Sequence, residues 1–270
     1  MSNLLQRIIT ALLGVGIIVT AIVFSPHSFA ILFGIIMLLT LEEFYKLAKS
    51  SGSNPFKTYG LLFSLLVFAL TYAVISGMVE SQFLWLLPAL LFVCFIIPLF
   101  SSKDRHPINC LAMTLFGVIY ILVPFTLLLV VGYSQGSYEY SIIIGLLLAQ
   151  WSSDSGAYIA GKTLGKTKLF ERVSPNKTWE GTIGGAVLAL GMLYGWAQFF
   201  DVLSLVEWLG LAMIMVVFGS LGDLVESLFK RTFDIKDSGS SIPGHGGFLD
   251  RFDGLIISLP FATAYLMLVV

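Results

Sequence analysis

Acidic side chains inside or beside apolar segments are the residues of this chain with the clearest chemical meaning. Asp223, Glu226 and Lys230 are spaced i, i+3 and i+7, so on a helix they lie along one stripe. Asp250 and Asp253 are three residues apart and precede the last apolar segment, where they can face that stripe. Carboxylates near lysines, without thiolates, are typical of a site for a hard cation such as Mg²⁺. A solvated charged loop would not explain Asp223, which lies about two helical turns inside an apolar segment.

Asp154 is another acid inside an apolar segment, where a carboxylate costs about 2.5–3.5 kcal/mol on insertion scales. It must therefore face a cavity or a partner, and Tyr158, four residues on, shares its helix face. Two interpretations stay open: Asp154 contributes to the cation site, or it pairs with a lysine of a neighbouring helix. The small residues around it favour close helix packing; they are Gly156, Ala157, Ala160 and Gly161.

The letters from Gly156 to Thr163 read G-x-x-x-x-G-K-T, which is the pattern of a phosphate-binding P-loop. A P-loop requires a preceding strand and a helix that begins just after the lysine. Here a long apolar segment precedes the pattern, and we expect Gly161 to end that helix. We therefore reject a P-loop.

Two other segments carry features that suit phosphate. Ser174 as N-cap and Pro175 at the first helical position predict a helix start, with Lys177 in its first turn. A helix N-terminus with a lysine suits an anion, although Lys177 could instead reach lipid headgroups. His245 is flanked by glycines, including Gly246, which let the backbone approach a phosphate closely.

The elements that must position these residues are membrane-spanning helices. The chain is 57% hydrophobic and only 11% charged, against roughly 25% charged residues in an ordinary soluble domain. A span needs about 20 apolar residues, and helices are favoured because every backbone polar group must be paired inside the bilayer. We identify nine such segments, at about 8–24, 28–44, 59–77, 82–100, 110–133, 141–160, 181–200, 206–229 and 254–270. The sequence thus predicts an all-α polytopic membrane protein.

The positive charges predict its orientation. All 15 Lys and Arg residues lie at the N-terminus or after the second, fourth, sixth and eighth segments. The other side carries only Glu80, Glu139, Asp201 and Glu207. By the positive-inside rule the N-terminus is cytoplasmic and the C-terminus is outside.

The two halves of the chain differ in polarity. We expect an N-terminal five-span region, 1–140, without charges inside its membrane segments. The C-terminal four-span region, 141–270, has longer cytoplasmic loops at 161–180 and 230–253, and loops of that length are usually functional. The chemistry is therefore expected in the second half.

From Ser227 to Asp253 the chain resembles the signature of the phosphatidate cytidylyltransferases, or CDP-diacylglycerol synthases. The matching letters are Ser227, Lys230-Arg231, Lys236-Asp237-x-Gly239 and Ile242-Pro243-x-His245-Gly246-Gly247-Phe248-x-Asp250-Arg251-Phe252-Asp253, with Phe229 in the apolar slot. We find no departure from the pattern over these 27 residues, 227–253. The stretches 154–162 and 174–181 are also similar to the membrane core of that family, whereas the first half matches only in general character.

The resemblance implies that CTP and phosphatidate react to give CDP-diacylglycerol and pyrophosphate, with Mg²⁺ and with a second cation left open. The second pKa of a phosphate monoester is about 6, so phosphatidate is already a nucleophilic dianion at neutral pH. No general base is required, and the carboxylates are better assigned to metal. The expected metal ligands are Asp223, Asp250, Asp253, Asp154 and Glu226.

Further roles follow from the same resemblance. The expected catalytic set is Asp223, Asp250, Lys230, Lys236 and His245. Residues expected to bind CTP are Ser174, Lys177, Arg231, Gly246, Gly247 and Arg251. The implied setting is a bacterial inner membrane with the site facing the cytoplasm; the lipid bilayer is a partner, nucleic acid is not, and homodimer formation is left open.

Three other functions would also suit a membrane protein with intramembrane acids. A CTP-dependent lipid kinase would transfer the γ-phosphoryl group and release CDP. A CDP-alcohol phosphotransferase is disfavoured because Asp253-Gly254 is followed by Leu-Ile-Ile-Ser rather than that family's motif. A secondary transporter would also place acids in the membrane, but it usually shows internal repeats with broken helices.

Overall fold

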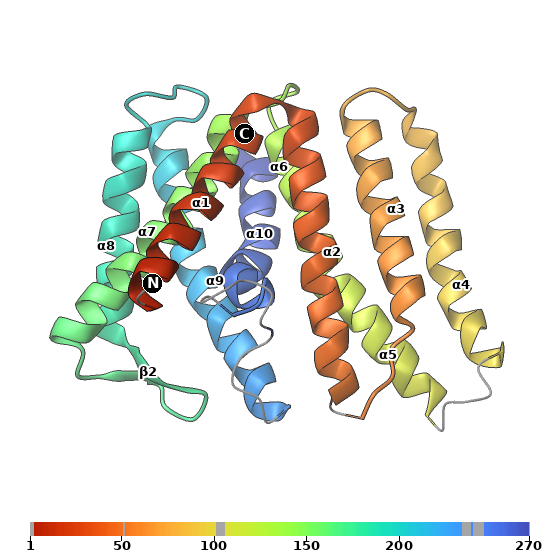
Figure 1. Cartoon of the computed structure of the whole chain (residues 1–270). Coiled ribbons are helices and arrows are strands. Elements are labelled where there is room, and N and C mark those ends of the chain that lie inside the picture. The colour runs from red at the N-terminus through yellow and green to blue at the C-terminus, as the bar shows by residue number, and fades with distance from the viewer. Residues whose placement is uncertain (1–2, 51, 101–105, 234–238, 240–245, 270) are drawn as a thin grey trace. The chain divides into compact units, whose positions relative to one another are not determined.

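The computed structural model of the chain describes residues 3–50, 52–100, 106–233, 239 and 246–269. Among these it contains nine helical segments, with α5 and α6 counted as one because a π-helical turn joins them, and one short hairpin (Figure 1). A 3-10 turn, Ser81–Trp85, leads into α4, and a π-helical turn, Val118–Leu122, joins α5 to α6. The elements are α1 (Asn3–Phe24), α2 (Pro26–Ser50), α3 (Lys57–Ile75), α4 (Leu86–Phe100), α5 (Pro107–Gly117), α6 (Val123–Gly132), α7 (Tyr140–Leu164), β1 (Lys168–Phe170), β2 (Ser174–Thr178), α8 (Trp179–Trp196), α9 (Leu205–Thr232) and α10 (Leu249–Val269).

Six helical segments of the described chain are long and apolar enough to cross a membrane. They are Pro26–Ser50, Lys57–Ile75, Ser81–Phe100, Pro107–Gly132, Leu205–Thr232 and Leu249–Val269. In Ser81–Phe100, only 6% of the most apolar 18-residue stretch is buried inside the protein, as expected for a helix whose side chains face lipid. The prediction of an all-α integral membrane protein is therefore confirmed, while the full set of nine spans and their direction stay predictions.

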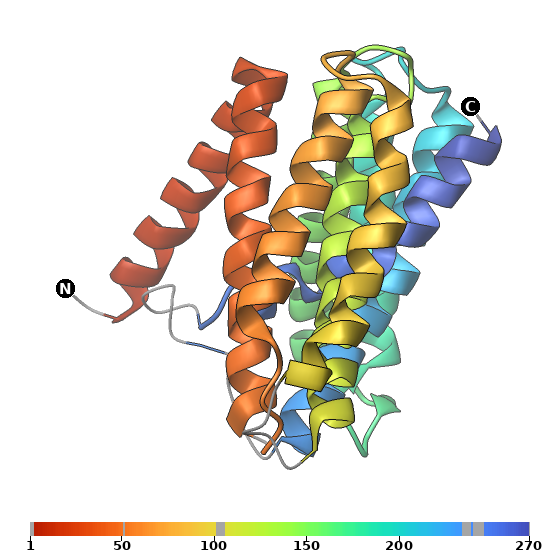
Figure 2. The same cartoon turned by 90° about the vertical axis from the view of Figure 1, so that its right-hand side faces the viewer.

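The helices form two compact units. One contains the chain up to Leu129 together with the segment that ends at Asp250; the other contains Val130 to α9 and the part of α10 from Arg251 onward. Within the first unit, α2, α3 and α4 follow one another as antiparallel neighbours (Figure 2). The two helices α6 and α10 each contribute to both units.

Aromatic side chains of α2 fill the core of the N-terminal unit. Phe44 is buried and stacks on Phe116, with ring centroids 5.6 Å apart. The buried Tyr45 donates a hydrogen bond from its hydroxyl to the carbonyl of Thr114, at 3.0 Å. A Cβ at Gly60 would lie 2.1 Å from the Tyr45 hydroxyl, so only glycine lets α3 approach α2 this closely.

Small residues bring α7 and α8 together in the C-terminal unit. A Cβ added at Gly156 would lie 2.6 Å from the backbone oxygen of Gly184, and one at Gly184 would lie 2.2 Å from the Cβ of Ala160. A Cβ at Gly185 would lie 2.7 Å from the backbone oxygen of Ser153. The packing role predicted for the small residues of this segment is therefore confirmed.

The segment before α8 is a hairpin, and the predicted helix start at Ser174 is wrong. Ser174–Thr178 forms β2, which pairs antiparallel with β1, and Phe170 lies opposite Ser174. The helix begins at Trp179, where the Thr178 hydroxyl accepts the amide of Gly181 at 3.2 Å. Lys177 is therefore a strand residue. The Ser-Pro pattern is a local signal, and here pairing with another segment overrides it.

The end of α7 also differs from the expectation. The helix runs through Gly161 to Leu164, and Gly165 is its C-terminal cap. All of the letters of the apparent P-loop, 156–163, are therefore helical. The rejection of the P-loop is confirmed, but Gly161 serves packing against Gly181 rather than helix termination.

The α7–α8 contact generates a prediction on stability. Gly156→Ala should destabilise the protein by about 1–3 kcal/mol, because the new methyl group meets backbone that cannot move aside. The measurement is thermal unfolding of purified protein in detergent. Gly191→Ala is the matched control on α8, where a Cβ meets nothing within 4 Å, and it should shift stability by less than about 1 kcal/mol. Equal melting temperatures of the two variants would contradict the packing argument.

Candidate metal centre

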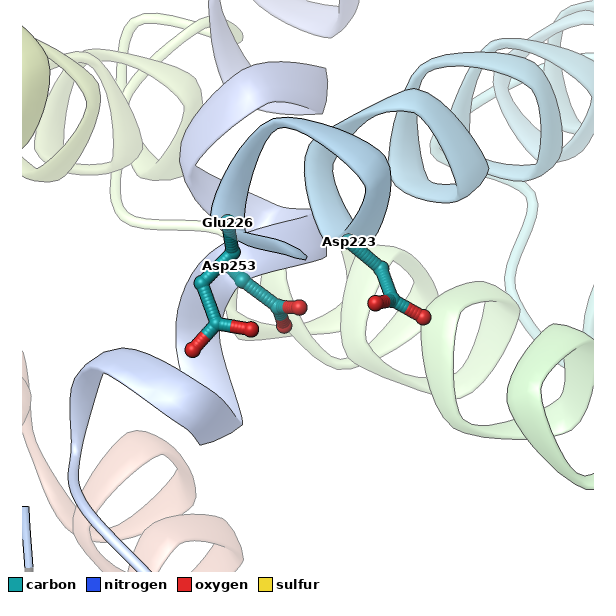
Figure 3. Close-up of side chains that lie close together, drawn as sticks. All are labelled: Asp223, Glu226 and Asp253. Carbon is teal, nitrogen blue, oxygen red and sulfur yellow. The ribbon is translucent and has the colours of Figure 1, made fainter. Parts of the chain in front are cut away.

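Three carboxylates meet where α9 and α10 lie against each other. Asp223 and Glu226 come from α9 and Asp253 from α10, and one oxygen from each lies within 4.8 Å of the others (Figure 3). Glu226 is 2% exposed, and the other two are partly exposed. The helices can approach because Gly222 has no side chain: a Cβ there would lie 2.5 Å from the Asp253 carbonyl and 2.8 Å from the Cα of Gly254. The cluster therefore depends on this backbone contact.

Lysines compensate part of the negative charge of this cluster. The ammonium of Lys177, on β2, lies 2.7 Å from a carboxylate oxygen of Asp223 and donates to the carbonyl of Ser220 at 2.9 Å. Lys230 forms an ion pair with Glu226 one turn away on α9. The predicted stripe of Asp223, Glu226 and Lys230 is thus present, and the hairpin adds a second lysine to it.

Asp154 lies beside the cluster on α7. Both of its carboxylate oxygens accept hydrogen bonds from the side-chain amide of Gln150, at 3.1 and 3.3 Å, and its charge interacts with Asp223. Gln150 itself is buried. A Cβ added at Gly219 would lie 2.4 Å from its amide oxygen, and one at Gly254 would lie 2.5 Å from its amide nitrogen. Within the described residues, Asp154 therefore takes its hydrogen bonds from an amide rather than from a lysine.

Gln150 was not recognised from the sequence. It precedes Asp154 by one helical turn in the same apolar segment, and that spacing was an available signal. Its side chain connects α7 to the glycines of α9 and α10 that line the cluster.

Glu180 attaches the hairpin to α8. Its carboxylate accepts the backbone amides of Lys166 and Thr167 at 3.1 Å and the Thr167 hydroxyl at 2.8 Å. Hydrogen bonds from its own backbone amide, from these two amides and from the hydroxyl stabilise the ionised form and lower the pKa of Glu180 to about 2. The carboxylate is therefore charged at any physiological pH, and it holds the base of the hairpin that carries Lys177.

Asp250 lies one turn before Asp253 on α10 and belongs to the N-terminal unit. Its carboxylate accepts the backbone amide of Gly247 at 2.8 Å. Gly246 has a φ of 82°, which favours glycine, and a Cβ there would lie 2.6 Å from the Asp250 carboxylate. These contacts form a tight turn at the start of α10.

The other residues predicted for the site fall into two groups. Ser174 lies at the start of β2, while Arg231 and Arg251 are exposed on α9 and α10. Lys236 and His245 lie outside the described residues. The geometry thus brings together Asp223, Glu226 and Asp253, with Lys177, Lys230 and Asp154 around them.

The expectation that the first half lacks charges inside its apolar helices is wrong. Glu43 is 3% exposed on α2, and its carboxylate accepts the backbone amide of Leu249 at 3.0 Å. The acidic pair Glu42-Glu43 at the end of an apolar run was the available signal.

The fold and the site define the class of this protein. It is a polytopic helical membrane protein with three clustered carboxylates and adjacent lysines. The chain belongs to the cytidylyltransferase family, whose family model matches residues 5–269. The resemblance stated from the signature residues is therefore confirmed.

Similar proteins from three bacteria carry the name phosphatidate cytidylyltransferase. The protein of Staphylococcus aureus (strain COL) is 42% identical over 172 residues, which cover 62% of this chain and 63% of the relative. That of Bacillus subtilis (strain 168) is 50% identical over 116 residues, covering 41% and 42% of the two chains. That of Staphylococcus saprophyticus is 41% identical over 168 residues, covering 62% and 63%. The matched region thus spans less than two thirds of these relatives.

The cluster predicts a cation site that can be tested without substrate. Mn²⁺ is a paramagnetic cation that also takes oxygen ligands, so its binding can be followed by electron paramagnetic resonance. Asp223→Asn and Asp253→Asn should each weaken Mn²⁺ binding by about 10- to 100-fold, because each removes one charged ligand. Asp201→Asn, in the exposed turn before α9, is the control and should bind like the wild type. Unchanged affinity in both cluster variants would refute a metal site here.

Proposed function

We propose that this protein transfers the cytidylyl group of CTP to phosphatidate and forms CDP-diacylglycerol and pyrophosphate. The observation that carries the proposal is the carboxylate cluster of α9 and α10, with Lys177 against it, in a chain of the cytidylyltransferase family. The name shared by the relatives from Staphylococcus and Bacillus supports the choice of phosphatidate as the acceptor.

The proposed reaction needs no proton transfer. A phosphate oxygen of dianionic phosphatidate forms a bond to the α-phosphorus of CTP, and the bond from that phosphorus to the bridging oxygen breaks. Pyrophosphate leaves with the electron pair of the broken bond. The side chains must therefore bind and align two polyanions and stabilise charge, rather than act as an acid or a base.

The cluster fits Mg²⁺, since its donors are carboxylate oxygens from two rigid helices. Asp223, Glu226 and Asp253 would hold the cation, with Asp154 beside them and Asp250 one turn away on α10. A bound Mg²⁺ supplies charge neutralisation and alignment of the phosphates. A second cation belongs to the same proposal.

Lys177 is assigned to the triphosphate. An ammonium group has three hydrogen-bond donors, and two of them are directed to Asp223 and to the Ser220 carbonyl. A phosphate oxygen of CTP can take the third, so that Lys177 stabilises the charge that develops on the departing pyrophosphate. Ser174 and Arg231 are assigned to the same substrate.

The connection before α10 supplies the remaining residues of the proposed site. Lys230 is assigned to the reacting phosphates together with Lys236 and His245. Gly246, Gly247 and Arg251 are assigned to binding CTP. The positive φ of Gly246 supports a turn that a phosphate can approach closely.

The membrane arrangement is part of the proposal. The nine helical segments cross the membrane with the N-terminus in the cytoplasm and the C-terminus outside, and the membrane is the bacterial cytoplasmic membrane. Within the C-terminal unit, β2 and the C-terminal end of α9 lie at the same end (Figure 1), where the lysines are also concentrated. CTP then arrives from the cytoplasm and phosphatidate from the adjacent leaflet.

A product assay tests the activity. Detergent-purified protein is incubated with phosphatidate, Mg²⁺ and CTP labelled at the α-phosphate, with and without EDTA. The label should enter the lipid phase with release of pyrophosphate, and EDTA should abolish the transfer. Label retained in soluble CDP, with the γ-phosphate in the lipid, would instead establish a lipid kinase.

The role of Lys177 gives a second prediction. Lys177→Met should lower kcat by about 10²–10³-fold, as expected for loss of one donor to developing charge. The same assay measures the rate at saturating CTP. Lys166→Met, an exposed lysine just before β1, is the matched control and should retain nearly full activity. A Lys177→Met variant as active as this control would remove Lys177 from the site.

A further inference from the structure

Two neighbouring acids at the end of α2 lie in different surroundings. Glu42 is partly exposed and forms ion pairs with Lys46 at 3.2 Å and Lys57 at 2.8 Å. Glu43, in the N-terminal unit, is only 3% exposed. A carboxylate in that environment is costly unless hydrogen-bond donors compensate it, so the contacts of Glu43 are informative.

One contact of Glu43 is with the start of α10. Its carboxylate accepts the backbone amide of Leu249 at 3.0 Å, across 206 positions of the chain. Leu249 is the first residue of α10 and is 1% exposed. The first amides of a helix have no acceptor within the helix, and a negative charge at that end is favourable. Glu43 therefore acts as an N-terminal cap that α2 supplies to α10.

A second contact of Glu43 is with Gly239, which lies in the connection between α9 and α10. A Cβ at Gly239 would lie 2.8 Å from a carboxylate oxygen of Glu43 and 3.0 Å from its carboxyl carbon. The backbone of Gly239 thus lies directly against the carboxylate. Glu43 contacts the connection between α9 and α10 at two places, Gly239 and Leu249, both of which are in the N-terminal unit.

We propose that Glu43 is a positioning residue for cytidylyl transfer, which holds the start of α10 through the Leu249 amide and the backbone of Gly239. The proposal rests on the proposed function. Asp250 lies in the first turn of α10 and Asp253 one turn further, so the place where the helix begins determines the position of both carboxylates along its axis. Displacement of reacting groups by about 1 Å costs about 10²-fold in rate. Glu43 itself touches neither substrate.

Three variants test this role in the full-length protein. Glu43→Ala removes the acceptor, Glu43→Gln keeps an acceptor oxygen and the shape, and Glu42→Ala is the control for loss of an adjacent acid. The first measurement is hydrogen–deuterium exchange of peptides that contain Leu249. Exchange of this amide should be at least tenfold faster in Glu43→Ala, whereas Glu42→Ala should match the wild type and Glu43→Gln should lie close to it.

The second measurement is kinetic, with rates expressed per folded protein. Glu43→Ala should lower kcat by about 10²-fold and change KM for CTP by less than threefold, because alignment rather than substrate contact is lost. Glu43→Gln should recover most of the activity. A role in stability alone would lower the folded fraction without lowering kcat of the folded protein.

If Glu43→Ala does not fold, Gly239→Ala replaces it, since the new methyl group would displace the carboxylate from its present position. This variant should show the same faster exchange and lower kcat. Unchanged exchange at Leu249 would overturn the proposed contact, and faster exchange with unchanged kcat would overturn the positioning role. If the wild-type protein forms no CDP-diacylglycerol, the proposed function itself is overturned. The assay of the wild type alone distinguishes this outcome from failure of the Glu43 contact or of its positioning role.

Discussion

The constraint on which this structure depends is that a carboxylate in an apolar helix requires a partner. Four acids of the apolar helices satisfy this requirement with a contact to another turn or another element. The contacts are Asp223 with Lys177, Glu226 with Lys230, Asp154 with Gln150, and Glu43 with the amide of Leu249. The Lys177–Asp223 ion pair therefore also holds the hairpin against α9, and Glu43 holds the start of α10, whereas the other two contacts lie within one helix.

The features that could be predicted from the sequence are those with a local periodic signal. Apolar length located all nine helical segments, and helical spacing placed Asp223 and Glu226 on one stripe. The position of Asp253 before the last apolar segment also predicted that it could face this stripe, as it does. Other long-range contacts could not be predicted in this way. The helix start predicted at Ser174 is a strand in the structure, and Thr178 is the helix cap. The partner of Glu43, the amide of Leu249, lies 206 residues away. No local pattern encodes either contact.

The geometry of the carboxylate cluster is set by backbone more than by side chains. Gly222 lies against the backbone of α10, and the amide group of Gln150 fills the space beside Gly219 and Gly254. Glycine at these positions lets α9 and α10 approach until short aspartate side chains meet. Short side chains have few rotamers, so their oxygens are well positioned before any ligand binds.

The division of α10 between the two units has a consequence for the way this chain can be shortened. The C-terminal half contains every residue of the family signature and all of the clustered acids. The first two residues of α10, Leu249 and Asp250, however, belong to the N-terminal unit, where α2 provides the acceptor for the leading amide. A gene fragment that encodes only the signature half would therefore lack α2, and its last helix would begin without the acceptor for its leading amide.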